Sequence, residues 1–198
     1  MKSAAIGCFV LALVLTFSVV AYGISAYNGL VGLDEAVDSS WAQVENVYQR
    51  RADLIPNLVA TVKGSADFEQ ETLNQVVEAR SKVGSINVSG TPTAEQMQAF
   101  QQAQGGLSSA LSRLLVVVEQ YPDIKSTENF RDLQAQLEGA ENRIAVERKR
   151  YNEVAQSFNT KRRRFPTSVI AGWFGFDEPK PYFESDKGAD QAPTVDFS

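Results

Sequence analysis

The pattern of hydrophobic and polar positions divides the chain into an uncharged N-terminal run and a long region with helical periodicity. Residues 3–33 carry no charged side chain, and residues 6–24 within them are almost wholly apolar. A helix that crosses a bilayer needs about 20 apolar residues, whereas the apolar part of a cleavable signal has about 7 to 15. We therefore expect a retained transmembrane anchor over residues 1–26, with cleavage after Gly23 or Ala26 as the alternative.

Beyond the anchor, apolar residues recur alternately four and three positions apart, which is typical of helices that pack against other helices. The first predicted helix ends near residue 62. Its inward positions are apolar with one exception, Arg51: Val37, Trp41, Val44, Tyr48, Arg51, Ile55, Leu58 and Val62. Lys63 and Gly64 predict its end, and the capping-box spacing of Asp67 and Gln70 predicts the start of a second helix. A single unbroken helix to Val83 is the alternative.

Three further helices follow the same rhythm. The second has the inward positions Phe68, Thr72, Leu73, Val76, Ala79 and Val83. Turn-forming residues at 84–93 predict a loop, and Thr93 with Gln96 has the capping-box spacing that starts a third helix. Pro122 is expected to end that helix, whose inward positions are Met97, Phe100, Gln104, Leu107, Leu111, Leu114, Val118 and Tyr121. The fourth is predicted from Thr127 to about Arg164, with the inward positions Phe130, Leu133, Leu137, Ala140, Ile144, Tyr151, Val154 and Phe158.

These lengths predict an all-α fold, in which the N-terminal transmembrane helix is followed by an antiparallel up-and-down four-helix bundle over residues 27–164. At 1.5 Å per residue, Arg51 and Glu141 both stand about 35 Å above the bilayer edge. A charged residue in an apolar seam needs a hydrogen-bonded partner. We therefore predict that Arg51 meets Glu141, with Asn142 or Glu147 assisting, as a polar layer that fixes helix register or, alternatively, as a ligand site.

The same topology brings the end of the fourth helix back to the membrane. Four consecutive cations lie there: Lys161, Arg162, Arg163 and Arg164. The following segment, residues 165–183, is rich in aromatic and aliphatic side chains, among them Phe165, Trp173 and Phe174. Cationic side chains favour anionic headgroups and aromatic rings favour the membrane interface, so we expect a second membrane contact in this segment. The alternative is that its aromatic side chains cap the open end of the bundle core.

Composition restricts the chemistry that is available. The chain of 198 residues contains no histidine and one cysteine, and that cysteine, Cys8, lies inside the anchor. Cys/His zinc sites, Ser-His-Asp triads, Cys-His dyads and Glu-x-x-His di-iron sites therefore lack essential residues. Carboxylates alone could still support acid/base chemistry, but 24 acidic residues spread along helical faces are more often solvated surface. We therefore expect no catalytic residue, no cofactor and no metal, and a protein that is not an enzyme.

Charge bears on partners and on orientation. The net charge of −5 argues against a nucleic-acid partner, because the phosphate backbone requires a surplus of Lys and Arg on one face. Six acidic residues and three prolines between 177 and 198 predict a disordered acidic tail, which we place at 184–198. Lys2 precedes the anchor, whereas Asp34 and Glu35 follow it, so the positive-inside rule places the bundle outside the cytoplasm. The cytoplasmic orientation is the alternative.

Four strings carry a resemblance to a known family. They are YNGLVGLDEAVDSSWAQVENVYQRRADLIPNLVATVKG, VVEARSKV, ALSRLLVVVEQYPDIKSTENFRDLQAQLEGAENRIAVERKRYNEVAQSFNTKRRRFP and WFGFDEPKPYFE. From Tyr27 to Glu184 the chain resembles the LemA family of bacterial membrane proteins. The resemblance implies a single N-terminal transmembrane helix, a soluble antiparallel helical bundle and no established enzymatic activity.

The resemblance also singles out residues in this chain. The residues characteristic of the family are Arg51, Asp53, Pro56, Asn57, Pro122, Asn129, Glu141, Asn142, Arg148, Tyr151, Asn152 and Asn159. Pro56 removes a helical hydrogen bond, which should kink the helix and leave the carbonyl of Ala52 free for another donor. The side chain of Asn57 is a candidate to reorganise that break locally.

Two other family residues have predicted partners. Tyr151 and Trp41 fall at a similar height above the membrane along the bundle and should form a packing pair. Arg148 is a candidate for a second polar layer with Glu45 or Glu147. Because so many polar groups lie along one seam, a groove that binds a peptide or a partner helix is an alternative interpretation of these residues.

Two classes of function fit these observations. The first is a non-enzymatic, membrane-anchored scaffold or adaptor of the bacterial cell envelope, whose bundle recruits proteins or a second copy of itself. The second is a sensor-type bundle that binds a small ligand or peptide and signals through a partner. In both, we expect a single-pass protein of the bacterial inner membrane.

Overall fold

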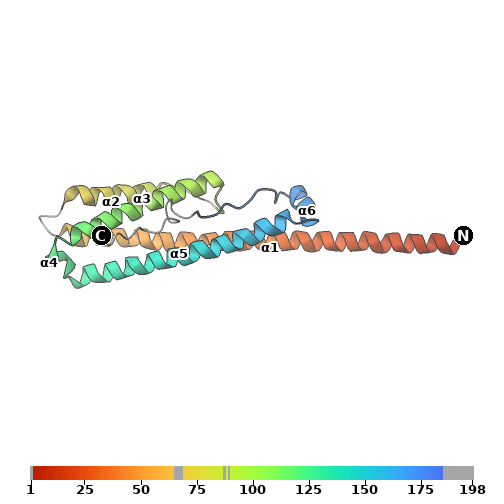
Figure 1. The fold of residues 1–198 in the computed structure, drawn as a ribbon, viewed down its shortest axis with the longest axis horizontal. Coiled ribbons are helices and arrows are strands. Elements are labelled where there is room, and N and C mark those ends of the chain that lie inside the picture. The colour runs from red at the N-terminus through yellow and green to blue at the C-terminus, as the bar shows by residue number, and fades with distance from the viewer. Residues whose placement is uncertain (1, 65–68, 87, 89, 185–198) are drawn as a thin grey trace, which may run out of the picture.

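The computed structural model describes residues 2–64, 69–86, 88 and 90–184. Within these ranges the chain forms helices and no strand, which confirms the all-α prediction. The helices are α1 (Lys2–Lys63), α2 (Gln70–Gly84), α3 (Ala94–Val118), α4 (Pro122–Lys125), α5 (Glu128–Arg163) and α6 (Thr167–Trp173). Four of them, α1, α2, α3 and α5, run antiparallel as a bundle, and the short α4 and α6 lie towards opposite ends of it (Figure 1).

Helix α1 contains both the apolar segment and the first helix of the bundle. Its 62 residues span about 93 Å at 1.5 Å per residue, and its N-terminal part projects beyond the bundle (Figure 1). The large apolar side chains described between Ile6 and Ile24 are exposed, and this helix is long and apolar enough to cross a membrane. The apolar segment therefore continues into the bundle without a break, while its retention in the mature protein stays a prediction.

The predicted end of the first helix is confirmed, because α1 ends at Lys63 and Gly64 lies in a turn. The alternative of one unbroken helix to residue 83 is wrong. The predicted capping box is also wrong: the N-cap of α2 is Glu69 and makes no side-chain capping hydrogen bond. Gln70 instead donates to Asn74 along the helix. Asp67 and Phe68 lie outside the described residues.

The start of α3 forms as predicted. The backbone N–H of Gln96 donates to Thr93 Oγ1 at 3.3 Å, and the N–H of Thr93 donates to Gln96 Oε1 at 2.9 Å, a complete capping box. The end differs, since α3 stops at Val118 and Pro122 opens α4. A proline at the first helical position loses no hydrogen bond, because that N–H has no helical partner in any case. Helix α5 begins after the N-cap Thr127, as predicted.

The core consists of two hydrophobic clusters along the bundle. One lies at the end distant from the apolar segment and contains Ile55, Leu58 and Val62 of α1 with residues of α2, α3 and α5. The other lies nearer the apolar segment and contains Trp41, with residues of α3, α5 and α6. All eight predicted inward positions of the first helix are buried, including Arg51, which falls between the two clusters in sequence.

The segment after α6 departs from the disorder that the acidic residues from 177 onward indicate, and it includes Glu184, which we placed in the tail. Residues 176–184, here named the strap, form an extended segment. The strap leaves α6 and runs back along α5 (Figure 1). Phe183 is 6% exposed and belongs to the second core cluster. A buried aromatic ring gives this acidic segment an apolar anchor, which its average composition conceals. The rest of the predicted tail, residues 185–198, lies outside the described residues.

Candidate functional site

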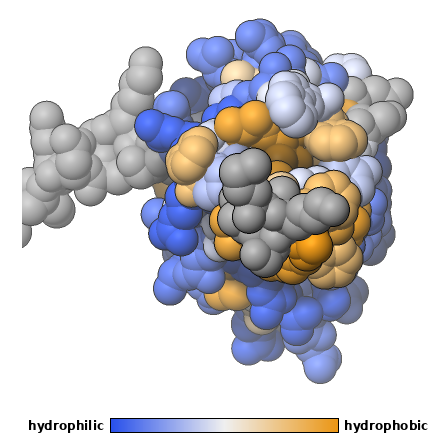
Figure 2. Space-filling view, turned by 90° about the vertical axis from the view of Figure 1, so that its right-hand side faces the viewer, coloured by the Kyte–Doolittle hydropathy of each residue, from blue (hydrophilic) through white to orange (hydrophobic). Residues whose placement is uncertain are grey.

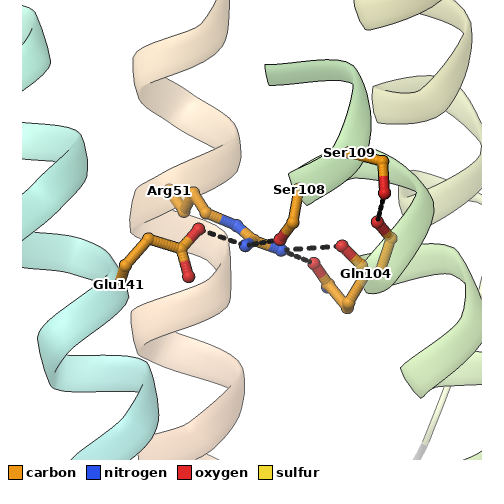
Figure 3. Close-up of polar contacts among 6 residues, drawn as sticks. Arg51, Gln104, Ser108, Ser109 and Glu141 are labelled. Atoms are coloured by element: carbon orange, nitrogen blue, oxygen red, sulfur yellow. Dashed lines mark hydrogen bonds and ion pairs between the residues drawn. The ribbon is translucent and has the colours of Figure 1, made fainter. Parts of the chain in front are cut away.

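A polar layer crosses the bundle where three helices meet. Arg51 of α1 is 1% exposed, and its Nη1 donates to Glu141 Oε1 of α5 at 2.5 Å and to Ser108 Oγ of α3 at 2.8 Å. Its Nη2 donates to the side-chain Oε1 of Gln104 and, at 3.4 Å, to the carbonyl oxygen of the same residue (Figure 3). The predicted contact between Arg51 and Glu141 is therefore present.

The predicted assistants of this ion pair are absent from the layer. Asn142 is exposed, and Glu147 pairs with Arg150 on its own helix. Gln104 and Ser108 take their place, because α3 faces Arg51 from the side opposite α5 (Figure 3). A signal for Gln104 was available: it is the single polar member of the inward positions predicted for α3.

The layer combines a fully buried cation with a half-exposed anion. The Glu141 side chain is 47% exposed, and the guanidinium of Arg51 lies 5.1 Å from the ring centroid of Tyr48. A groove of about 370 Å³ opens beside the layer between α3 and α5, with Gly105 and Arg148 also in its lining. One face of the ion pair is thus accessible from outside the bundle.

The break that Pro56 introduces into α1 is satisfied from another helix. Pro56 lies inside α1 without ending it, and Nε of Arg80 on α2 donates to the Ala52 carbonyl oxygen at 3.0 Å. Asn57 does not reorganise the break in the way proposed, since its side chain is exposed and its carbonyl accepts from Thr61 at 2.9 Å. Arg80 therefore supplies the donor that the sequence required but did not identify.

Two asparagines of α5 hold the strap by its backbone. Asn159 accepts from the Lys180 N–H at 2.9 Å and donates to the Lys180 carbonyl oxygen at 2.8 Å. Asn152 makes the same pair with Phe183, at 2.9 and 3.0 Å. Seven helical residues span about 10.5 Å and three extended residues about 10 Å, so the two spacings match. Each amide thus replaces a neighbouring strand for one residue of the strap.

The strap ends in an aromatic cluster near the apolar end of the bundle. Phe183 stacks on Trp41 with ring centroids 6.0 Å apart, and Tyr151 lies 5.7 Å from Trp41, so the predicted Trp41–Tyr151 pair is observed. Burial raises the pKa of the Tyr151 hydroxyl well above its usual range. Arg148 does not pair with Glu45 or Glu147 as predicted; it donates to the Glu184 carbonyl oxygen at 2.7 Å and covers the Phe183 ring.

The basic run at the end of α5 divides between two roles. Arg162 donates to the Asp177 carbonyl oxygen and so helps to hold the strap, whereas Arg163 and Arg164 are exposed. Lys161 is half-buried, and its ammonium lies against Gly29 of α1, where a Cβ atom would collide with it. A cation is thereby fixed beside the helix that carries the apolar segment.

The aromatic side chains after this run also divide. Phe174 packs on Tyr27 of α1 with centroids 5.0 Å apart, whereas Phe165 and Trp173 are 84% and 79% exposed. Phe176, the first residue of the strap, lies 6.3 Å from Phe158 in the core. Capping of the core therefore accounts for Phe176 but leaves Phe165 and Trp173 on the surface.

The remaining family residues lie on the surface. Asp53 accepts from Gln49 at 2.8 Å on the same helix, and Asn129 is exposed on the first turn of α5. Pro122 opens α4. None of these three positions joins the polar layer.

The fold and these sites define a class of protein, a helical bundle that stands on one apolar N-terminal helix and is closed by a C-terminal strap. The chain belongs to the LemA family, whose family model matches residues 40–197. It is therefore a membrane-associated helical protein of the LemA type.

Its curated relatives share about a quarter of its residues. Magnetosome protein MamQ 2 of Paramagnetospirillum magneticum is 28% identical over 187 residues, which cover 85% of this chain and 68% of the relative. Magnetosome protein MamQ of Magnetospirillum gryphiswaldense is 26% identical over 82% of this chain and 66% of the relative. Protein LemA of Metamycoplasma hominis is 25% identical over 82% and 72%, respectively.

Proposed function

We propose that this protein is a non-enzymatic, membrane-anchored scaffold of the bacterial cell envelope, which holds a protein partner at a fixed height above the bilayer. The observation that carries the proposal is the continuity of α1 from its exposed apolar segment to buried Val62. A flexible linker would let the bundle swing, whereas a continuous helix fixes its direction relative to the anchor. A bundle held in this way suits recruitment at a defined distance.

The groove between α3 and α5 is the surface that we assign to the partner. Arg51 stands about 40 Å beyond Ile24 along α1, so the groove lies well clear of the membrane. It offers buried Arg51 and half-exposed Glu141 to a polar group of a partner segment, and Gly105 leaves its wall open. Helices and extended peptides are the segments that such grooves accommodate.

Two adjacent glycines allow a matched test of this surface. Gly105 lines the α3–α5 groove and Gly106 lines a hollow on the α2–α3 side, and a Cβ atom at either would meet nothing within 4 Å. Gly105→Leu and Gly106→Leu should therefore both fold, and each should gain about 1 kcal/mol of helix propensity. Only the first fills the groove.

The test is photocrosslinking in living cells from the exposed position 109 on the rim. We expect a discrete protein adduct that survives Gly106→Leu and is lost in Gly105→Leu. An adduct that Gly105→Leu leaves unchanged, or the lack of any discrete adduct in the native chain, would contradict the proposal.

A sensor-type bundle is the second candidate, and the half-exposed ion pair favours it. A small ligand with a carboxylate could compete with Glu141 for the cation of Arg51 and signal through a partner. A ligand that binds only the folded state raises the thermal midpoint by mass action. A library of small carboxylates that raises the midpoint of the native chain, but not of Gly105→Leu, would favour the sensor over the scaffold.

For both candidates we propose a single pass through the bacterial inner membrane, with the bundle on the extracytoplasmic side. Lys2 before the apolar segment and the acidic residues after it support this orientation. Self-association of the bundle is compatible with the scaffold, and the same crosslinks would reveal it.

A further inference from the structure

Two hollows adjoin where α6 and the end of α5 lie against α1. The first, of about 560 Å³, is almost wholly apolar and has Val19 and Ile24 of α1 on one side and Val169 and Trp173 of α6 on the other. The second, of about 550 Å³, has a mixed lining with two cations and is here named the polar hollow; it contains Ser157, Thr160, Lys161 and Arg164 of α5 and its C-cap. Tyr22 and Phe165 line both hollows, so a single molecule could occupy the two.

The depths of the hollows follow from the rise of α1. Its exposed apolar segment, Ile6–Ile24, spans about 28 Å, close to the ~30 Å of a hydrocarbon core. The apolar hollow reaches down to Val19 and so extends below the last residue of this span. The polar hollow reaches up to Leu33, about 14 Å beyond Ile24, at the level of headgroups. The almost wholly apolar lining thus reaches deeper along α1 than the lining with the two cations, which is the order in which a bilayer places acyl chains and headgroups.

The position of α6 is fixed by contacts that do not involve lipid. Thr167 and Ala171 are 6% and 2% exposed, and Tyr22 and Thr167 hydroxyls lie 3.2 Å apart. The strap, held by Asn152 and Asn159, ties the other end of this segment to α5. The hollows are therefore preformed, and a ligand would not have to order α6 on binding.

Several large apolar side chains around the two hollows are exposed to solvent. Seen from the N-terminal side, hydrophobic residues gather around the axis inside a hydrophilic rim (Figure 2). Phe165, Val169, Trp173 and Phe174 remain 44% to 84% exposed in the protein alone. Aromatic side chains at this level are typical of a membrane interface, and they are continuous with the exposed apolar face of α1.

We propose that α1, α5 and α6 form a binding site for one anionic phospholipid. Its phosphate lies between Lys161 and Arg164 in the polar hollow, and one acyl chain fills the apolar hollow. Charge complementarity selects the anionic headgroup, since both cations line the polar hollow. The site rests on the membrane anchorage that belongs to the proposed function, and it gives the bundle a second attachment that opposes rotation about α1.

The test is native mass spectrometry of the full chain, released from detergent after incubation with phosphatidylglycerol or phosphatidylcholine. We expect one retained phosphatidylglycerol per chain. Arg164→Gln should lower its retention about fivefold, whereas Arg163→Gln, which removes the same charge outside the polar hollow, should leave it nearly unchanged. Equal retention of the two lipids, or equal effects of the two arginine variants, would overturn the headgroup site.

The apolar hollow has its own matched pair. Gly23 lines it, Gly7 does not, and a Cβ atom at either position would meet nothing within 4 Å. Gly23→Leu should fill the hollow and reduce lipid retention, while Gly7→Leu should not. If retention is the same in both variants, no acyl chain occupies the hollow.

Fluorescence places the site in the membrane. The chain has two tryptophans: Trp173 is 79% exposed, while Trp41 is 1% exposed and stands about 25 Å beyond Ile24. In lipid nanodiscs with brominated acyl chains, quenching should occur in the native chain and disappear in Trp173→Phe. Equal quenching in both chains would overturn the membrane position of α6. A chain that fails to enter the discs at all would instead contradict the anchorage.

Discussion

The Nε atom of Arg80 lies 3.0 Å from the carbonyl oxygen of Ala52, the acceptor that Pro56 leaves without its helical N–H donor. This bond ties α2 to α1 at the one interruption of the α1 ladder. We predict that Arg80→Met destabilises the bundle by about 1 kcal/mol, because it removes the donor of a part-buried carbonyl.

A second substitution tests whether the effect of Arg80→Met depends on the Ala52 carbonyl. Pro56→Ala restores the N–H donor of residue 56, so in that background Arg80→Met should cost less than half as much. Chemical unfolding of the full chain in detergent gives the four stabilities of this double-mutant cycle. An additive result would mean that Arg80 stabilises the bundle independently of the Ala52 carbonyl.

The polar layer around Arg51 makes a second prediction. Glu141→Leu should destabilise the protein by about 2 kcal/mol, less than the 3–5 kcal/mol typical of a broken buried pair, because Glu141 is half-exposed. Replacing the layer as a whole, with Arg51→Met, Gln104→Leu and Glu141→Leu together, should recover most of that loss. A triple variant less stable than Glu141→Leu would show that the layer itself stabilises the fold.

The asparagine clamps on the strap make a third prediction. Asn152→Ala removes one acceptor from the Phe183 N–H and one donor to its carbonyl, so hydrogen exchange in the strap should accelerate about 10- to 100-fold. Asn159→Ala should act in the same way at Lys180. Asn142→Ala is the matched control, since that residue is exposed on the same helix. Mass spectrometry of strap peptides measures the rates, and equal rates in all three variants would contradict the clamp.

Some of this architecture could be predicted because the signals are local. The capping box of Thr93 and Gln96 involves residues three apart, so sequence spacing located the start of α3. The periodicity of apolar residues after Pro122 located the start of α5 at Thr127. Arg51 could be assigned to Glu141 because helix rise places them at equal height, with one charge in an apolar seam.

Other features depend on contacts between distant segments. Ser108 and Arg80 face their partners only once α2 and α3 have packed on α1, and no spacing reveals such neighbours. The strap was hidden because acidic, proline-rich composition predicts disorder, whereas two asparagine side chains and one buried ring suffice to order it. Two asparagines seven residues apart on one face of a helix were the available signal.

Two carboxyl groups should shift stability with pH in opposite directions. Burial raises the pKa of Glu45 above its ordinary 4.5, so its folded state binds protons more tightly than the unfolded chain. Stability from this group is present below pH 4.5 and is lost as pH rises through the raised pKa. Glu45→Gln should therefore stabilise the protein at neutral pH and have little effect below pH 4.5.

Glu95 is the counterpart at the start of α3. A hydrogen bond from its own backbone N–H, with Thr93 second, lowers its pKa below 4.5. Its contribution is present above pH 4.5 and is lost as pH falls through the lowered pKa, so Glu95→Gln should destabilise at neutral pH. Thermal midpoints of both variants across this range test the pair, and effects of the same sign at neutral pH would contradict it.

Orientation in the membrane can be tested by moving very few charges. Lys2 lies before the apolar segment, and Asp34 and Glu35 follow it, so changes at a few charged positions should alter the positive-inside bias. A reporter that is active only outside the cytoplasm, fused after Ser198, should be active with the native chain. Lys2→Gln combined with Glu35→Lys and Ser39→Lys, both at exposed positions of α1, should reverse the bias and silence the reporter. If the native chain silences this reporter, and a second reporter that works only in the cytoplasm is active when fused at the same position, the bundle and the partner groove lie inside the cell.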